Sequence, residues 1–187
     1  MSEMHKQVIS MNIKGQNISL KSLVPDEVDQ YYADWLNDPE VVKYLESRWN
    51  TYHLSDVKNY IQTINNSDKD YLLGIFLKGE NRHIGNIKIG GIDPIHRFAN
   101  VGLIIGEKKC WGKGYGTEAI SLATQIAFYK LNLNCLIAGI YSSNLSSYRA
   151  FLKAGWKEVG RFKKYRFFEG EYIDQINVQT YRDDQVY

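Results

Sequence analysis

Hydrophobic and polar positions along the first third of the chain follow two different periods, which separate strands from helices. Near the start, apolar and polar positions alternate as in half-buried strands, and later the apolar positions recur at helical spacing. Pro25 and the acidic residues after it favour a helix start, and Ser55 is a suitable N-cap for a later helix. The predicted elements are a β-hairpin formed by 7–13 and 18–23, a helix over 25–38, a short helical segment over 39–46 and a helix over 55–64.

The rest of the chain interleaves short apolar runs with helical stripes. The runs are rich in Ile, Leu and Val and are bounded by Gly, Pro and Asn, as strands are. One stripe follows a glycine-rich stretch, and a second helix closes at Gly155. The predicted strands cover 71–78, 83–92, 99–106, 135–141, 161–168 and 172–181, and the predicted helices cover 117–131 and 144–156. Hairpins first and a β-α-β-α section later indicate the α/β (α+β) class with a mixed sheet.

Length and composition are those of one folded domain. The 187 residues include 44% hydrophobic and 13% aromatic side chains, which is enough for a packed core. No internal repeat or linker-like tract divides the chain. We therefore expect a single domain over 8–182, with short tails at 1–7 and 183–187.

Charge, cysteine content and hydropathy argue against several classes of function. The formal net charge is +2 and the lysines cluster only in short pairs, so nucleic-acid binding is not expected. The two cysteines lie far apart without metal-ligand spacing, which predicts neither a metal site nor a disulfide framework. The start resembles no signal peptide, and no apolar run reaches membrane-spanning length. We expect a cytoplasmic protein without a membrane partner.

The stretch CWGKGYGTEAI places Gly112, Gly114 and Gly116 at alternate positions between a predicted strand and a predicted helix. The first N–H groups of a helix have no internal partner and lie at the positive end of its dipole. A loop without Cβ atoms lets an anion approach these groups, and Lys113 adds positive charge. The spacing matches neither the dinucleotide fingerprint nor the nucleoside-triphosphate loop. A phosphate or diphosphate ligand is one interpretation, and a tight turn without a ligand is the other.

Two segments together carry a resemblance to a known family. IGEKKCWGKGYGTEAISLATQIAFYKL is followed by YSSNLSSYRAFLKAGWKEVG, and with this spacing the chain resembles the GNAT superfamily of N-acetyltransferases. It is most similar to the branch that includes the ribosomal-protein N-terminal acetyltransferases, and the resemblance extends over 9–180. It implies a mixed, largely antiparallel, twisted sheet that is split by a cofactor cleft and flanked by about four helices. It also implies acetyl-CoA as the cosubstrate.

The same resemblance implies how acetyl-CoA is held. In the superfamily, backbone N–H groups of a [QR]-x-x-G-x-[GA] loop bind the diphosphate of coenzyme A, and here Trp111 takes the first position of that pattern. The preceding strand is expected to part from 135–141, so that the pantetheine arm pairs with it and an N–H near Leu103 polarises the acetyl carbonyl. The expected cofactor-binding residues are Leu103, Ile104, Ile105, Trp111, Gly112, Lys113, Gly114, Tyr115, Gly116, Thr117 and Asn144.

The base that takes the proton of the acceptor amine is left open. A lysine-like amine has a pKa near about 10.4 and is mostly protonated at neutral pH, so a base or a water chain is needed. Relatives often carry a glutamate on the fourth strand, but the matching residue here is Asn100, which cannot act as a base. Asp93, His96 and Glu107 are nearby alternatives, each of which also suits a surface or turn role. His96 is the preferred candidate because its ordinary pKa is the most suitable.

The group that protonates the leaving thiolate also departs from the common pattern. Many members have a tyrosine seven residues after the motif asparagine, where this chain has Phe151. The ribosomal-protein branch has a serine three residues after it, and Ser147 matches that serine. Its hydroxyl would donate a hydrogen bond to the thiolate or relay a proton through water. Asn144 and Ser147 also suit a helix cap, so both interpretations stay open.

The first part of the chain is expected to line the acceptor pocket. Aromatic residues beside Arg48 suit a nucleotide base or sugar with its phosphates, although helix packing explains many of them as well. WLNDPEVVKYLE and RHIGNIKIG resemble GNAT proteins of surface-polysaccharide and amino-sugar biosynthesis. We therefore expect a small-molecule amine acceptor such as a nucleotide-linked amino sugar. The alternatives are a protein N-terminal acetyltransferase and a non-catalytic acyl-CoA-binding domain, and a homodimer stays open.

Overall fold

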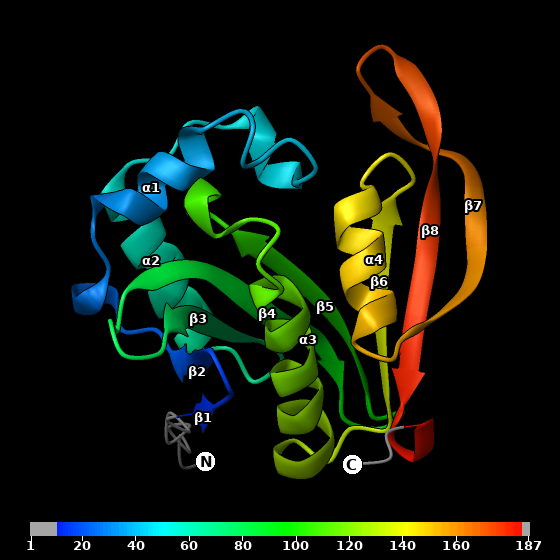
Figure 1. Ribbon diagram of the computed structural model, residues 1–187, viewed down its shortest axis with the longest axis horizontal. Coiled ribbons are helices and arrows are strands. Elements are labelled where there is room, and N and C mark those ends of the chain that lie inside the picture. The colour runs from blue at the N-terminus through cyan, green and yellow to red at the C-terminus, as the bar shows by residue number, and fades with distance from the viewer. Residues whose placement is uncertain (1–10, 185–187) are drawn as a thin grey trace, which may run out of the picture.

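A computed structural model describes residues 11–184 of the chain. Within them, eight strands form one sheet in the order β1-β2-β3-β4-β5-β6-β8-β7 (Figure 1). All neighbouring strands are antiparallel except β5 and β6, which confirms the expected mixed, largely antiparallel sheet. The strands are β1 (Asn12–Lys14), β2 (Ile18–Ser22), β3 (Tyr71–Leu77), β4 (His83–Asp93), β5 (Phe98–Ile105), β6 (Cys135–Tyr141), β7 (Lys157–Phe168) and β8 (Glu171–Tyr181).

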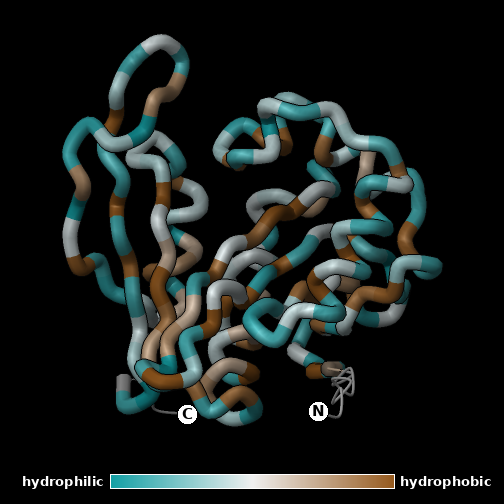
Figure 2. Tube along the Cα trace, turned by 180° about the vertical axis from the view of Figure 1, so that it is seen from behind, coloured by the Kyte–Doolittle hydropathy of each residue, from teal (hydrophilic) through white to brown (hydrophobic). Residues whose placement is uncertain are grey.

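Helices cover both faces of the sheet. The described α-helices are α1 (Gln30–Asn37), α2 (Leu54–Asn65), α3 (Tyr115–Gln125) and α4 (Leu145–Lys153). α1 and α2 bury one core against one face, and α3 and α4 bury a larger core against the other. Apolar segments accordingly run through the central strands, whereas polar segments dominate the loops (Figure 2). α3 lies against β2, β4 and β5 on one face, and α2 lies against β3 on the other.

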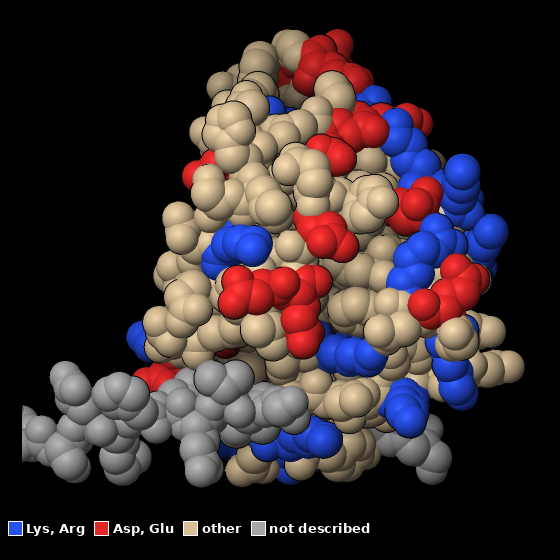
Figure 3. Space-filling model, turned by 90° about the vertical axis from the view of Figure 1, so that its left-hand side faces the viewer, with Lys and Arg blue, Asp and Glu red and all other residues tan. Residues whose placement is uncertain are grey.

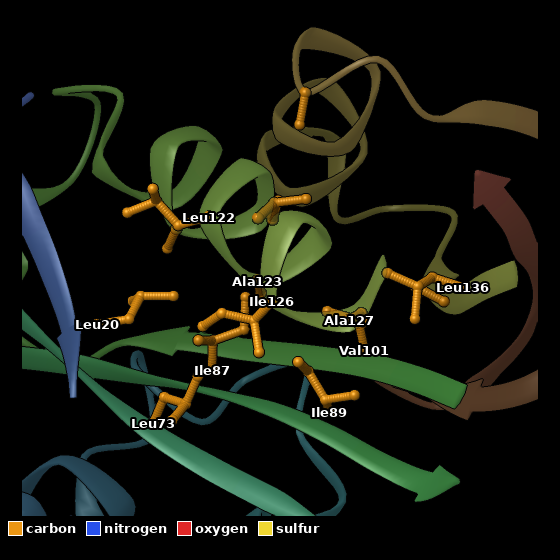
Figure 4. Close-up of a cluster of buried hydrophobic side chains, with 14 of the residues drawn as sticks. Leu20, Leu73, Ile87, Ile89, Val101, Leu122, Ala123, Ile126, Ala127 and Leu136 are labelled. Atoms are coloured by element: carbon orange, nitrogen blue, oxygen red, sulfur yellow. The ribbon is translucent and has the colours of Figure 1, made fainter. Parts of the chain in front are cut away.

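The larger core depends on the alternation of side chains along the central strands. Ile87 and Ile89 of β4 point toward Ala123 of α3 and Ile126, which directly follows α3 (Figure 4), and all four are buried. Successive side chains of a strand point to opposite faces, so the neighbouring polar residues Asn86 and Lys88 face the α1–α2 side. Burial of each large aliphatic side chain stabilises the fold by about 1.5–3 kcal/mol. On the α1–α2 face, β4 therefore presents polar side chains.

Two predicted helical segments in the first half are corrected by the structure. The helix expected over 25–38 is split into a single 3₁₀ turn, Pro25–Glu27, and α1, because Val28 leaves the turn with an extended backbone and is buried under α2. The helix expected over 39–46 is absent. Turns lead there into a 3₁₀ helix, η2 (Glu46–Trp49), which packs against a distant part of the sheet.

Several predicted boundaries also differ. α2 starts one residue earlier than expected, and its N-cap is His53 rather than Ser55, since the Asp56 carboxylate accepts the His53 backbone N–H at 2.8 Å. The helix expected over 117–131 begins at Tyr115 and continues after Gln125 as a π-turn. The strand expected over 161–168 begins at Lys157. Residues 7–10 of the expected first hairpin lie outside the described residues.

The sheet parts in the middle. β5 and β6 pair only through Phe98–Cys135, Ala99–Leu136 and Asn100–Ile137. Beyond Asn100, β5 continues along β4 as far as Ile105, whereas β6 continues along β8 as far as Tyr141. The two strands diverge from their paired end in Figure 1. Each therefore has an edge that no described strand completes.

Candidate active site

The glycine loop meets the N-terminus of α3 with an open approach. Gly112 and Gly114 have φ angles of 73° and 85°, a region that L side chains rarely adopt, and a Cβ atom on either would meet nothing within 4 Å. Gly114 is the N-cap of α3, and its carbonyl accepts the first helical hydrogen bond from Glu118 N at 3.0 Å. The N–H groups of 115–117 come before that bond and have no helical partner. This end of α3 can therefore receive an anion.

The edge of β5 lies beside this helix end. Gly106 N donates to Ile84 O of β4 at 2.9 Å, and backbone directions alternate along a strand, so the groups of Leu103 and Ile105 face away from β4. The Ile105 carbonyl accepts the Trp111 indole N–H at 2.7 Å, which fixes the start of the loop to the end of β5. A Cβ on Gly116 would lie 3.5 Å from Leu103 Cδ1. The structure thus brings together the loop, the first turn of α3 and the free edge near Leu103.

Asn144 and Ser147 lie on the other side of the parted strands, at the start of α4, which follows β6. Asn144 Oδ1 accepts hydrogen bonds from Ser147 N at 3.2 Å and Ser146 Oγ at 3.1 Å. Asn144 is therefore the N-cap of α4. Ser147 is half-buried in the first turn. Tyr148 points elsewhere, since its hydroxyl donates to Glu158 at 2.7 Å.

Of the three candidate bases from the sequence, Asp93 and His96 lie at the β4–β5 turn, away from the glycine loop, whereas Glu107 lies between β5 and that loop. His96 is exposed in the β4–β5 turn, at the opposite end of β5 from the glycine loop, and its backbone N–H binds Asp93 Oδ1 at 2.7 Å. That hydrogen bond holds the pKa of Asp93 below its ordinary value. Glu107 accepts from Lys109 N and pairs with Arg82 at 3.4 Å. All three have turn or surface roles, and catalysis by His96 stays a prediction without support from this geometry.

A pocket of about 760 Å³ lies on the α1–α2 side of the sheet. Its floor is formed by alternate residues of two paired strands, namely Asn86, Lys88 and Gly90 of β4 and Asn100, Gly102 and Ile104 of β5. The polar side chains of its walls come from α1, the segment around η2 and α2, namely Tyr32, Glu46, Ser47, Tyr52, Asp56 and Tyr60. Leu103 belongs both to this pocket and to the free edge of β5, so the two places are contiguous.

Most charges in the pocket are already neutralised. Lys88 pairs with Asp70 at 2.9 Å. Burial opposes the charge of Lys88, but the hydrogen bonds and electrostatic interactions with Asp70 and Tyr60 together outweigh it and raise the pKa of the lysine. Burial raises the pKa of Tyr32, which keeps that hydroxyl protonated. The Asp56 carboxylate accepts the His53 backbone N–H at the start of α2. Glu46 is the remaining charged side chain of the lining.

The segment around η2 ties the first half of the chain to the second across the parted strands. Glu46 Oε1 accepts from the Tyr141 hydroxyl at 2.7 Å and from Arg166 at 3.0 Å. Arg48 donates to the same Tyr141 hydroxyl at 3.1 Å, and Tyr44 stacks on Phe168 with ring centroids 5.1 Å apart. The predicted aromatic run therefore serves both packing and the pocket rim.

Sequence reasoning missed several of these residues. The sequence pattern could have identified Asn86 and Lys88, because they are polar residues on one face of an otherwise apolar strand. No sequence pattern could have identified Tyr141 and Arg166, since their partner Glu46 lies 95 and 120 positions away in the sequence. Only the fold brings them together.

Other kinds of site find little support in the described part of the chain. No three His, Cys, Asp or Glu side chains of residues 11–184 gather as a metal ion would require. None of the helices described there is long and apolar enough to cross a bilayer. On the face in Figure 3, basic side chains gather along the right-hand side and are interleaved with acidic ones.

Comparison with known proteins agrees with this geometry. Residues 17–157 match the family model described as "Acetyltransferase (GNAT) domain". An uncharacterized N-acetyltransferase p20 of Bacillus licheniformis is 26% identical over 162 residues, which are 85% of this chain and 89% of that protein. Spermidine N-acetyltransferase from Vibrio cholerae, solved with CoA and spermine, shares the fold with a TM-score of 0.79 and 18% identity, over 91% of this chain and 98% of that one. The ribosomal-protein-S5-alanine acetyltransferase of Vibrio fischeri also has a TM-score of 0.79, at 17% identity, over 95% and 100% of the two chains. This chain belongs to the GNAT acetyltransferase family and is an acetyl-CoA-dependent acyltransferase.

Proposed function

We propose that the chain moves the acetyl group of acetyl-CoA to the primary amine of a small acceptor bound in the pocket, by direct attack within a ternary complex. One observation carries the proposal: the free edge of β5 at Leu103 joins the pocket on one side and the glycine loop at the start of α3 on the other. An acetyl group placed at this edge and an amine in the pocket would be neighbours.

Acetyl-CoA fits the residues that are present. The N–H groups of 115–117 and the open space beside Gly112 and Gly114 suit its diphosphate, and Lys113 is exposed nearby. The backbone of Leu103–Ile105 offers the edge along which an extended arm adds like a strand. The cosubstrate supplies an activated acetyl thioester. Leu103 N–H is the donor we assign to its carbonyl oxygen.

Ser147 is the residue that we assign to the leaving sulfur. It lies on α4, the helix that follows the second of the parted strands, and its position matches the serine of the ribosomal-protein branch. The hydroxyl would donate a hydrogen bond to the thiolate or relay a proton from water. Asn144 keeps its capping role, and we assign it a contact with the arm as well.

A nucleotide-linked amino sugar is the acceptor class that the pocket rim favours. Arg48 directly follows the lining residues Glu46 and Ser47, and both of its hydrogen bonds go to neutral oxygens. Its guanidinium lies 4.3 Å from the Trp49 ring centroid, and Trp49 is 67% exposed. A cation beside an accessible aromatic face suits a phosphate and a base or sugar ring.

A polyamine acceptor fits this pocket less well, although one structural neighbour is a spermidine acetyltransferase. A polyamine carries several ammonium groups and needs several available carboxylates. Here the Asp56 carboxylate already accepts the His53 backbone N–H at the start of α2, and the Glu46 carboxylate already pairs with Arg166. The pocket thus provides one carboxylate for one amine.

The experiment is a thiol-release assay with acetyl-CoA and four classes of amine: glucosamine, a UDP-linked amino sugar, spermidine and a peptide with a free N-terminus. The proposal expects the highest kcat/KM with the nucleotide-linked sugar. Preference for the peptide would support a protein N-terminal acetyltransferase instead. Binding of coenzyme A without transfer to any amine would support a non-catalytic acyl-CoA-binding domain. A single domain over 8–182, a cytoplasmic location and a homodimer stay predictions.

A further inference from the structure

The pocket contains a carboxylate on η2 in place of the usual one on β5. Asn100 occupies the position where relatives often carry a glutamate, and its amide does not take up a proton at neutral pH. Glu46 lines the same pocket as Asn100, Gly102 and Leu103. The pocket that reaches the free edge of β5 therefore contains a proton acceptor, on a different element of the fold.

The other titratable side chains of the pocket are less suitable. Asp56 Oδ2 accepts the His53 backbone N–H at 2.8 Å and so stabilises the start of α2. Lys88 is a cation paired with Asp70. Burial raises the pKa of Tyr32, so that its hydroxyl is not a base at neutral pH. Of the two carboxylates in the lining, Asp56 caps α2, whereas Glu46 makes no capping hydrogen bond to a helix N-terminus.

Glu46 is held from two strands of the second half of the sheet. The Tyr141 hydroxyl and Arg166 both donate to Oε1, and no described residue binds Oε2. Tyr141 is 6% exposed, and its hydroxyl also accepts from Arg48, which fixes its orientation. One carboxylate oxygen is therefore anchored while the other is available to a ligand in the pocket.

We propose that Glu46 is the general base of the acetyl transfer and that Tyr141 and Arg166 are the positioning residues that hold it. The inference rests on the proposed function. The ammonium of the acceptor donates to Oε2 and gives one proton to the carboxylate, directly or through one water. The amine lone pair then forms the C–N bond with the acetyl carbon while the C–S bond breaks. The second amine proton passes to the sulfur, which leaves as a thiol, and Glu46 returns its proton to solvent.

The test is Glu46→Gln, because the amide oxygen can keep both hydrogen bonds and the variant should fold. With the best amine of the four classes, we expect kcat/KM for the amine to fall by about 10²–10⁴-fold near neutral pH. The KM for acetyl-CoA and the melting temperature should stay close to those of the wild type. Tyr141→Phe should lower kcat/KM less than Glu46→Gln, since it loosens the base without removing it.

The pH dependence separates catalysis from a structural role. Raising the pH toward about 9.5 converts more of the acceptor to the neutral amine, which needs no base, so the deficit of Glu46→Gln should shrink. The charged and titratable groups around Glu46 are Arg48, Tyr141 and Arg166. Burial, together with the hydrogen bond to Glu46, raises the pKa of Tyr141 above its ordinary value of 10.0.

The matched control is Glu169→Gln. Glu169 pairs with Lys43 at 2.9 Å, close in sequence to η2, but it does not line the pocket, so its loss should leave kcat/KM unchanged. A wild-type rate for Glu46→Gln, or a deficit that is constant with pH, would overturn the assignment of Glu46. If the wild type itself acetylates none of the amines, the proposed function fails instead. The wild-type assay therefore distinguishes failure of the proposed function from failure of the Glu46 assignment.

Discussion

The most direct test of the cosubstrate site is Gly114→Ala. Gly114 has a φ of 85°, and an added Cβ would meet no protein atom within 4 Å. The substitution therefore acts in only two ways: it strains the backbone, and it places a methyl group in the space in front of the first N–H groups of α3. Strain alone would lower stability, whereas the methyl group would also obstruct a diphosphate.

The size of each effect follows from the geometry. An alanine in the left-handed region costs about 1–2 kcal/mol, and the lower entropy of the unfolded chain returns about 0.4–1 kcal/mol. The net loss is about 1 kcal/mol, which for a chain of this size lowers Tm by about 2–4 °C. Loss of one or two charge-assisted hydrogen bonds to the diphosphate costs about 1.5–3 kcal/mol each. We therefore expect the Kd for coenzyme A to rise at least about tenfold.

Calorimetric titration with coenzyme A and thermal melts measure the two effects separately. Gly79→Ala is the matched control, since Gly79 has a φ of 91° and equally open surroundings but lies in the β3–β4 turn, away from α3. It should show the same loss of Tm and an unchanged Kd. If Gly114→Ala binds coenzyme A as tightly as Gly79→Ala does, no anion lies at this end of α3 and the reasoning is refuted.

Further predictions concern other parts of the site. Gly116→Ala should raise Tm, because alanine is favoured over glycine in a helix by up to about 1 kcal/mol and its Cβ finds ordinary contacts, yet it should weaken coenzyme A binding measured by titration. Gly102→Leu should raise the KM for the amine at least about tenfold without changing the Kd for coenzyme A, because the side chain fills part of the open pocket floor that the acceptor would occupy. Ser147→Ala should lower kcat by about 10²-fold or more while the Kd for coenzyme A stays the same; an unchanged kcat in the thiol-release assay would remove Ser147 from the mechanism. Burial opposes ionisation of Glu118, but its hydrogen bonds from Asn17 and the backbone outweigh this and lower the pKa, so its contribution is present above the ordinary carboxyl pKa and is lost as the pH falls through the folded value. Urea denaturation below about pH 5 should therefore show less acid sensitivity for Glu118→Gln than for the wild type.

Most elements of the fold could be predicted because their sequence patterns are local. The central strands, such as β4 with its alternating isoleucines, pack against helices directly and so keep a clear period. The segment 39–46 has helical spacing but forms turns. Val42 is buried, while Tyr44 and Glu46 reach across to β6 and β7. These distant contacts outweigh weak local propensity, and no local pattern reports them.

The site was predictable to the same extent. The glycine loop and Asn144 are short motifs in which sequence neighbours are also spatial neighbours. The sequence also indicated that a glutamate is missing at Asn100. It could not indicate a replacement, since Glu46 becomes a candidate base only when Tyr141 and Arg166 are placed beside it. His96 was chosen for its ordinary pKa and its place beside the fourth strand, but the sequence does not report that this turn lies at the opposite end of β5 from the glycine loop.

The parted strands explain why these pieces occur together. An uninterrupted sheet would pair β5 with β6 along their full length, whereas here three residue pairs remain and the backbone near Leu103 is left without a strand partner. A buried polar group without a partner costs about 1–3 kcal/mol, so such an edge is tolerated only where water or a ligand reaches it. Trp111 covers one carbonyl of the edge, and the contacts of Glu46 with Tyr141 and Arg166 join the two halves across it. The same contacts that compensate for the missing strand pairing hold the proposed base beside the edge where the acetyl group is expected, so stability and catalysis place the same demand on η2.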